Sequence, residues 1–323
     1  AEEIWKSAER LRGKFKAHEY QVVVLPIITI RRLECVLIKW REQKATEILS
    51  KRKTISDEAL EELVKSLELN PKQSPGFSNS TTWTLRKVYE EDHTLLEKNF
   101  RAYLNGFSET VQDILESFDY RAVIGKMVKN ARLAPILNQY STLDLGPDKL
   151  SSLEMGYIYE ELLRRFSEAH AEAAGDHFTP REVIRLMVEL LEIPIPDRHT
   201  SIYDPACGTG GMLALTEEAL KDFNPNIRVE LFGQELNDES FGICKSDMLV
   251  TGHDPEQIAF GNTLTSDAHA GKKFHYMLSN PPYGVDWKKY QDPIKAEAEN
   301  MGFEGRFGAG TPRISDGQLL FLQ

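Results

Sequence analysis

Short β-branched or apolar segments alternate with helical ones from Thr200 onward, and this alternation constrains the fold more than any other feature of the chain. The predicted strands and helices follow one another at 201–203, 212–221, 228–232, 240–250, 257–260 and 274–278. Such alternation is typical of βαβ units, in which a helix connects two parallel strands. We therefore predict an α/β domain with a parallel sheet in the second half of the chain.

The first half of the chain has a different pattern. From about residue 4 to residue 140, long segments rich in Leu, Glu, Lys and Arg contain few glycines or prolines, which predicts one helix after another. The segment 20–30 is β-branched enough for a buried strand, but its helical flanks favour a buried helix kinked at Pro26. The clearest loop is predicted at 70–82, where turn-forming residues concentrate.

A break between the two halves is predicted at Leu145-Gly146-Pro147-Asp148. We therefore expect an all-α domain over 1–145 and the α/β domain over 146–323. Within the second domain, Thr179-Pro180-Arg181-Glu182 has the pattern of a capping box at the start of an amphipathic helix. In that pattern Thr179 is the N-cap and Pro180 occupies the first helical position.

Composition argues against several classes of protein. The chain has 39 Lys and Arg against 50 Asp and Glu, and this net charge of −11 argues against a surface that binds polyanions generally. The longest apolar run, 20–30, is far shorter than a membrane span, and the first residues lack a charged-then-apolar pattern, so we expect neither a membrane helix nor a signal peptide. The cysteines Cys35, Cys207 and Cys244 lie far apart without a CxxC pair, so we expect neither a disulfide framework nor a metal site. Free cysteines fit a protein of the reducing cytoplasm best.

The first candidate site is the glycine-rich turn Asp204-Pro205-Ala206-Cys207-Gly208-Thr209-Gly210-Gly211, between a predicted strand and a predicted helix. Such a turn lets backbone amides approach a ligand at a helix N-terminus. Leu213 stands where a dinucleotide fingerprint needs its third glycine, and GxxxxGK[ST] is absent, so NAD and ATP are disfavoured. A tight connection without any ligand is the alternative. Cys207 is interpreted as a small residue that fills the loop rather than as a nucleophile.

Two further candidates follow the next two strands. Glu235 comes after the strand 228–232, where a carboxylate can accept two hydrogen bonds from ribose hydroxyls. Asn262 comes after the strand 257–260, where its side-chain amide can read the edge of an adenine. The alternatives are a solvent-exposed carboxylate and an ordinary turn residue.

The sharpest candidate is Asn280-Pro281-Pro282-Tyr283, shortly after the strand 274–278. Two prolines stiffen the chain and leave the Asn280 side-chain oxygen and the Pro281 carbonyl facing the same way. Two acceptors beside an aromatic ring suit a planar amino group. The alternative is a rigid proline turn with a buried tyrosine.

Together these segments resemble the amino-methyltransferases that use S-adenosylmethionine, and in particular the methylation subunits of type I restriction-modification systems. In the second half the resemblance rests on five motifs in order: His177-Phe178-Thr179-Pro180, the turn from Asp204 to Gly211, Gly233-Gln234-Glu235-Leu236-Asn237, Gly261-Asn262-Thr263-Leu264 and Asn280-Pro281-Pro282-Tyr283. In the first half it rests on Ile4-Trp5, Leu11-Arg12-Gly13, Glu19-Tyr20 and Met155-Gly156-Tyr157-Ile158-Tyr159-Glu160. Gly305-Arg306-Phe307-Gly308 and Asp316 to Gln323 resemble the segment that follows NPPY in that family.

The resemblance implies a Rossmann-like methyltransferase sheet preceded by an all-α N-terminal domain. It also implies further strands and helices after Gln323, so we expect the catalytic domain at 146–323 to be incomplete. For the cofactor, it implies the following roles: Asp204, Gly208 and Gly210 hold the methionine part, Glu235 the ribose and Asn262 the adenine, while Phe178, Thr179 and Pro180 close the pocket. Asn280 and Pro281 are then the acceptors for the target amine, and Tyr283 stacks on the base.

The implied activity is site-specific transfer of a methyl group from S-adenosylmethionine to the N6 amino group of a flipped-out adenine in DNA. A specificity subunit and a restriction subunit are the implied partners, and the implied DNA contacts run mainly through a partner. Residues 271–313 contain seven Lys or Arg and five Asp or Glu, a local charge of +2 that favours salt-dependent DNA binding together with a partner. The four glycines at 302, 305, 308 and 310 lead us to expect that 288–313 is mobile until substrate orders it.

Three other functions remain as alternatives. Asn-Pro-Pro-Tyr also serves enzymes that methylate a protein glutamine, but those are not expected to have this type of helical first half. A cytosine N4 amino group is a second possible acceptor, although Asn rather than Ser at position 280 favours adenine by resemblance. A non-catalytic assembly subunit that keeps the fold is the third, and the intact acceptors at 280 and 281 argue against it.

Overall fold

The computed structural model divides into two compact units. It describes residues 4–6, 10–16, 19–51, 54–169, 179–193 and 199–323. Unit 1 comprises Ala1–Glu172 together with Ser246–Pro255, and unit 2 comprises Ala173–Lys245 together with Glu256–Gln323. Unit 1 is therefore discontinuous in sequence, because a short segment from the second half of the chain belongs to it.

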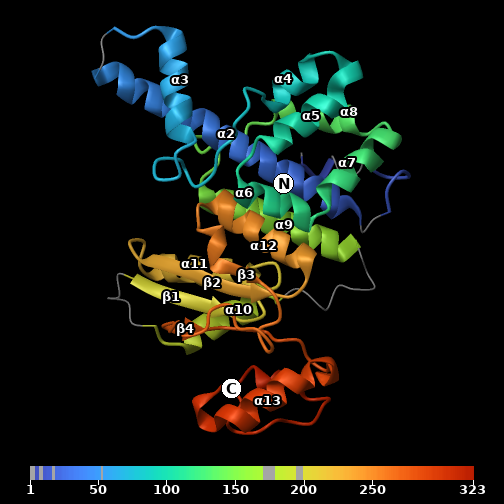
Figure 1. Ribbon diagram of the computed structural model, residues 1–323, viewed down its shortest axis with the longest axis vertical. Helices are drawn as coiled ribbons and strands as arrows, with labels where there is room; N and C mark the ends of the chain where they lie inside the picture. The colour runs from blue at the N-terminus through green and yellow to red at the C-terminus, as the bar shows by residue number, and fades with distance from the viewer. Residues whose placement is uncertain (1–3, 7–9, 17–18, 52–53, 170–178, 194–198) are drawn as a thin grey trace. The chain divides into compact units, whose positions relative to one another are not determined.

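Unit 1 is built from helices in its described part (Figure 1). Its α-helices are α2 (Tyr20–Lys51), α3 (Asp57–Glu68), α4 (Leu85–Glu90), α5 (Leu96–Asn105), α6 (Glu109–Ser117), α7 (Tyr120–Lys129), α8 (Leu133–Thr142) and α9 (Ser152–Ala169), and α5 is preceded by the 3-10 turn η2 (His93–Leu95). The predicted all-α character of this part of the chain is confirmed. The predicted loop at 70–82 is confirmed as well, since it contains neither a helix nor a strand.

Helix α2 forms the centre of unit 1. All of its residues from Val23 to Ile30 are buried, and Pro26 lies inside the helix. The prediction of a buried helix rather than a buried strand in this segment is therefore confirmed. Near its middle, Arg32 is also buried, and its Nη1 atom donates hydrogen bonds to the carbonyl oxygens of Leu145 at 2.6 Å and Leu150 at 2.9 Å.

Arg32 also connects α2 to the segment of unit 1 that comes from the second half of the chain. Its Nε atom lies 3.5 Å from the carbonyl oxygen of Val250, near the end of α12 (Asp238–Thr251). Burial lowers the pKa of this guanidinium. Because a buried charge without hydrogen bonds is costly, these carbonyl oxygens stabilise Arg32 and hold three separate segments together.

Unit 2 contains a four-stranded parallel sheet with the strand order β3-β2-β1-β4. The strands are β1 (His199–Asp204), β2 (Arg228–Glu235), β3 (Ile258–Phe260) and β4 (Tyr276–Met277). Tyr203 is aligned with Phe232 on one side and with Met277 on the other. The predicted parallel sheet is confirmed, and all four strands therefore end at the same edge.

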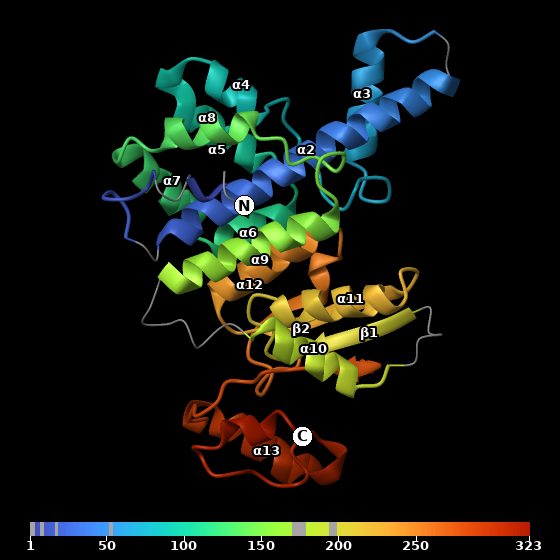
Figure 2. The same cartoon turned by 180° about the vertical axis from the view of Figure 1, so that it is seen from behind.

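Two helices cover one face of this sheet. Helix α11 (Gly211–Phe223) packs against β1 and β2, and α10 (Arg181–Leu190) packs against α11, on the side nearer the viewer in Figure 2. The amphipathic helix predicted after Thr179 is confirmed, but its predicted capping box is wrong. Pro180 is the N-cap of α10, the helix has no side-chain cap, and the Thr179 hydroxyl bonds to another part of unit 2. No helix in the described part of the chain is both long and apolar enough to span a membrane.

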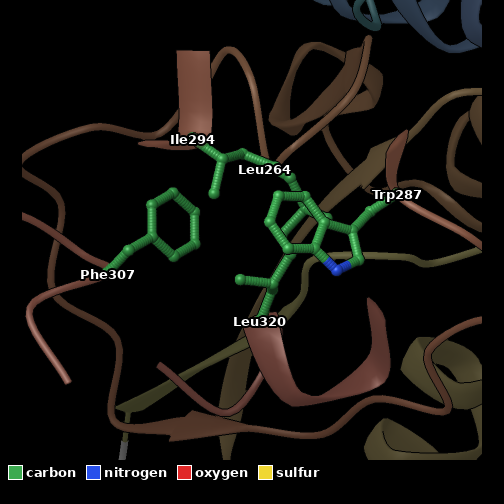
Figure 3. Close-up of a cluster of buried hydrophobic side chains, with 5 residues drawn as sticks. All are labelled: Leu264, Trp287, Ile294, Phe307 and Leu320. Carbon is green, nitrogen blue, oxygen red and sulfur yellow. The ribbon is translucent and has the colours of Figure 1, made fainter. Parts of the chain in front are cut away.

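The chain after β4 forms a small layer with its own buried cluster. It contains η4 (Lys288–Tyr290), α13 (Gln291–Met301), η5 (Gly302–Glu304) and η6 (Gly317–Leu320). Figure 3 shows five side chains that point toward one another, namely Leu264, Trp287, Ile294, Phe307 and Leu320. The sequence pattern does not predict α13, because the glycines around it indicate a mobile segment.

Candidate active site

The carboxyl edge of the sheet brings the sequence candidates of unit 2 together. Asp204 is the last residue of β1, and Glu235 is the last residue of β2. Asn262 lies two residues beyond the end of β3, and Asn280 lies three residues beyond the end of β4. Phe178 lies outside the described residues. Four candidates from four strands therefore lie at one edge, as expected for a ligand site in a parallel α/β sheet.

Asp204 is a buried carboxyl group whose ionisation is hindered. Its side chain accepts a hydrogen bond from the Ala206 amide at 3.0 Å, and the residue is only 2% exposed. Burial raises the pKa of Asp204 to about 7, and the nearby charge of Glu235 adds to the shift, while the Ala206 amide and the Ser279 hydroxyl oppose it. A carboxylate in this position gains from a cation placed beside it, because the cation offsets the cost of burying the charge.

Glu235 fastens the glycine-rich turn to the end of β2. Its Oε2 atom accepts a hydrogen bond from the Gly208 amide at 2.8 Å, and its Oε1 atom accepts one from the Asn237 amide at 2.7 Å. The Cys207 amide adds a backbone bond of 3.1 Å to the carbonyl oxygen of Gln234. Each carboxylate oxygen has two acceptor positions, so Glu235 can hold the turn and still accept bonds from a diol. The sequence pattern does not predict that Glu235 also holds the glycine-rich turn.

Position 210 requires a glycine, because of both the backbone conformation and the neighbouring atoms. Its φ of +86° lies in the left-handed region, and a Cβ atom at this position would meet the Cys244 sulfur at 2.8 Å. Helix α11 begins at the next residue, Gly211. The turn therefore brings its backbone close to α12 at a point where no side chain fits.

Two buried thiols lie beneath this turn. Cys207 and Cys244 are both buried, and their sulfur atoms are 4.0 Å apart. The hydrogen bond to Cys244 and burial raise the pKa of the Cys207 thiol. A buried, neutral thiol is a poor nucleophile, which agrees with the interpretation of Cys207 as a residue that fills the loop.

The loop after β3 is held by several contacts to the rest of the edge. The Asn262 side-chain oxygen accepts a hydrogen bond from the Leu264 amide at 2.9 Å, and the Thr263 hydroxyl donates to the Pro205 carbonyl at 2.6 Å. The side chain of Gln234, which is 1% exposed, donates to the Ser266 carbonyl at 2.8 Å and accepts from the Ala268 amide at 3.2 Å. Gln234 is thus a buried support of this loop. Its place between Gly233 and Glu235 was the only signal of that role in the sequence.

The NPPY segment presents two acceptors and an exposed ring. The Asn280 amide nitrogen donates a hydrogen bond to the Thr179 hydroxyl at 3.1 Å. Within the described part of the chain, neither the Asn280 side-chain oxygen nor the Pro281 carbonyl oxygen has a hydrogen-bond partner. Tyr283 is 84% exposed, which contradicts the alternative of a buried tyrosine. The segment therefore offers two acceptors to a donor from outside, together with an aromatic surface.

Comparison with known protein families identifies both halves of the chain. The family described as N-6 DNA Methylase matches residues 151–323, and the family described as HsdM N-terminal domain matches residues 1–139. The chain belongs to the N-6 DNA methylase family. The resemblance inferred from the five motifs is thereby confirmed.

Individual relatives of known name agree with this membership. A protein of Methanocaldococcus jannaschii named type I restriction enzyme MjaIX methylase subunit is 25% identical over 290 residues, which cover 87% of this chain and 50% of the relative. This chain therefore spans about half the length of that relative.

Two solved structures share the fold. The type I restriction-modification methyltransferase subunit from Streptococcus thermophilus has a TM-score of 0.75 at 21% identity and covers 99% of this chain and 69% of its own. A chain from a structure on complex assembly and conformational transition of a type I restriction-modification system has a TM-score of 0.58 at 21% identity, with coverages of 100% and 60%. The predicted fold class, an α/β methyltransferase sheet preceded by helices, is confirmed.

Proposed function

We propose that this chain transfers a methyl group from S-adenosylmethionine to the N6 amino group of an adenine that is flipped out of DNA. The observation that carries the proposal is the hydrogen bond from the Asn280 amide to Thr179, in a member of the N-6 DNA methylase family. This bond uses the nitrogen of the Asn280 side chain and leaves its oxygen free to accept one hydrogen of an amino group, while the Pro281 carbonyl can accept the other.

The residues at the sheet edge fit the proposed cofactor. Asp204, whose pKa is raised by burial, suits the α-ammonium group of the methionine part, and Gly208 and Gly210 let the backbone approach it. Glu235 has acceptor positions for the ribose hydroxyls, and Asn262 has a side-chain amide nitrogen for the adenine. In this proposal Phe178, Thr179 and Pro180 close the pocket. The cofactor supplies a methyl group made electrophilic by the positive sulfonium.

The chemistry asked of the protein is to make a poor nucleophile attack. The nitrogen lone pair of an exocyclic amine is conjugated with its ring. Two acceptors that hold its hydrogens, the Asn280 oxygen and the Pro281 carbonyl, turn the lone pair toward the methyl group and stabilise the positive charge that develops on nitrogen. The sulfur keeps the electron pair of the broken S–C bond and leaves as a neutral thioether, and the methylated nitrogen then loses one proton to water, so no general base is needed in the transfer step.

The exposed ring of Tyr283 suits a base that has left the double helix. A base within a duplex cannot reach groups at the sheet edge, so the target must be unstacked and flipped. Stacking on an aromatic side chain replaces part of the energy lost, at about 1–3 kcal/mol per base. A side chain as exposed as Tyr283 can make this contact without any rearrangement of the core.

The proposed partners are DNA, a specificity subunit and a restriction subunit. The relative from Methanocaldococcus jannaschii is named as a subunit of a restriction enzyme, which supports assembly of this kind. The local charge of +2 at 271–313 supports DNA contacts that are shared with a partner. We propose a domain boundary at 145/146, between the two family matches, although the compact unit 1 continues beyond it to Glu172. We also propose that the protein is cytoplasmic, because three free thiols are stable in a reducing compartment.

The test uses the full-length protein with its specificity subunit, labelled S-adenosylmethionine and cognate DNA. Wild type should transfer label to N6 of adenine. Asn280→Ala should nearly abolish transfer and leave cofactor binding close to normal, whereas Glu235→Ala should lose cofactor binding.

Each alternative has its own outcome in the same assay. Label in protein would favour a glutamine methyltransferase, and label at cytosine N4 would change the acceptor. A wild-type protein that binds no cofactor would overturn the enzyme proposal in favour of an assembly subunit. Loss of cofactor binding as the only effect of Asn280→Ala would overturn the assignment of Asn280.

A further inference from the structure

The loop that carries Asn262 is held by Arg306, which belongs to the segment after NPPY. The Arg306 Nη1 atom donates a hydrogen bond to the Thr263 carbonyl at 2.6 Å, and its Nη2 atom donates to the Leu264 carbonyl at 3.3 Å. Both carbonyls follow directly after Asn262 in the chain. Arg306 therefore fixes the backbone at the point where the loop presents Asn262.

Glu297 on α13 fixes the guanidinium of Arg306 in turn. Its Oε1 atom accepts hydrogen bonds from the Arg306 Nε atom at 3.0 Å and from the Arg306 amide at 2.8 Å, and its Oε2 atom accepts from Nη2 at 2.7 Å. These bonds and the charge of Arg306 lower the pKa of Glu297. A two-point contact of this kind orients the guanidinium plane, which a lysine ammonium cannot reproduce.

The side chain of Leu264 ties the loop to the same segment a second time. It is buried in the cluster of Figure 3, whose other four members lie between Trp287 and Leu320. The Leu264 amide donates to the Asn262 side-chain oxygen, and the Leu264 carbonyl accepts from Arg306. A continuous set of contacts thus runs from Glu297 through Arg306 and Leu264 to Asn262.

We propose that Arg306 is a positioning residue for cofactor binding, which acts by holding the loop that presents Asn262 to the adenine of the cofactor. The proposal rests on the proposed function and adds a residue more than forty positions away from Asn262. In this proposal the segment after NPPY supports the cofactor loop in addition to its proposed contacts with DNA. Arg306 bonds to backbone carbonyls of the loop, and Glu297 bonds to Arg306, so we expect both residues to shape the adenine contact without making it.

The test measures the cofactor KM and kcat of the full-length protein with its specificity subunit and DNA. Arg306→Gln removes the donors to both carbonyls, and we expect the cofactor KM to rise about tenfold. The kcat at saturating cofactor should stay within about threefold of wild type. Arg306→Lys keeps the positive charge beside Glu297 but lacks the paired donors of the guanidinium. Its cofactor KM should therefore lie between the KM of wild type and that of Arg306→Gln.

Two comparisons separate positioning from simple destabilisation. Ile294→Val trims a fully buried member of the same cluster but keeps every hydrogen bond of Arg306, so it should lower the melting temperature and raise the cofactor KM far less than Arg306→Gln does. In a double-mutant cycle, Arg306→Gln should add little to the loss caused by Asn262→Ala, because both changes disrupt one contact.

Additive losses in that cycle, or an unchanged cofactor KM in both Arg306 variants, would overturn the proposal. A rise in KM for Ile294→Val as large as that for Arg306→Gln would do the same. Failure of the proposed function would look different, because the wild-type protein itself would then bind no cofactor or label no DNA.

Discussion

The hydroxyl of Thr179 accepts a hydrogen bond from the side-chain amide of Asn280, at 3.1 Å and across 101 positions of the sequence. Thr179 precedes the first described helix of unit 2, and Asn280 follows the last strand of its sheet. The bond uses the side-chain nitrogen of Asn280 and leaves the side-chain oxygen to accept a hydrogen bond from a bound substrate. An apparent helix cap therefore orients the proposed acceptor of the target amine.

Replacement of Thr179 by valine tests this relationship. Thr179→Val keeps the size of the side chain and removes the acceptor, so Asn280 can rotate. We expect kcat for methyl transfer to fall about tenfold, which corresponds to the loss of one hydrogen bond. Thr179→Ser is the matched control and should restore most of the rate. Equal losses in the serine and valine variants would contradict this role.

Burial of Asp204 predicts a dependence of stability on pH. Its pKa is raised to about 7 in the folded chain, from an ordinary value of 3.8. A raised carboxyl pKa gives stability that is fully present below the unfolded value and is lost as pH rises through the folded value. Between pH 5 and pH 8, this group alone should lower the free energy of unfolding by about 3 kcal/mol in the protein without cofactor.

Asp204→Asn supplies the comparison for that prediction. The amide cannot ionise, so the stability of the variant relative to wild type should increase from pH 5 to pH 8. Urea unfolding of both proteins at the two pH values measures the difference. A gap between variant and wild type that does not change with pH would show that Asp204 titrates normally in the folded chain.

Gly210 and Gly211 offer a matched pair in the glycine-rich turn. Gly210→Ala should destabilise the protein, because a side chain at a φ of +86° is strained and its Cβ meets the Cys244 sulfur at 2.8 Å. Gly211→Ala meets no atom within 4 Å, so its melting temperature should stay close to that of wild type. Thermal unfolding of the two variants decides the point, and similar melting temperatures would refute the steric argument.

Tyr283 should affect DNA use without affecting stability. Because the ring is 84% exposed, Tyr283→Ala should leave the melting temperature unchanged. Loss of stacking on the flipped base should lower kcat/KM for DNA about tenfold or more. Tyr283→Phe keeps the ring and should stay within about threefold of wild type. A phenylalanine variant as impaired as the alanine variant would point to the hydroxyl instead.

Local patterns were sufficient to predict the parallel sheet and its candidate edge. The alternation of strands and helices after Thr200 predicts the order of the elements, and the polar residues at strand ends predict which residues lie at the carboxyl edge of the sheet. Strand β4, Tyr276–Met277, is shorter than the predicted strand 274–278. The Ser201 amide donates to the Nδ1 atom of His275 at 3.1 Å, in place of a backbone carbonyl of a longer strand.

Contacts between distant segments could not be predicted in the same way. The roles of Thr179 and Arg306 depend on partners 101 and 43 positions away. The sequence does not predict helix α13, because the glycines around it indicate a mobile segment and its one buried residue, Ile294, adds almost no periodic signal. The helix is stabilised by a cluster that includes Leu264 from another loop. Pairings of this kind follow from the folded topology rather than from propensity.

The discontinuity of unit 1 has a consequence for the synthesis of the chain. The segment Ser246–Pro255 belongs to this unit, and the Val250 carbonyl lies near the buried guanidinium of Arg32. The nascent N-terminal helices can therefore form early on the ribosome, but their last contacts must wait until residue 255 has been added. A gene fragment that ends at residue 172 should yield a protein that lacks these contacts and is more readily cleaved by proteases.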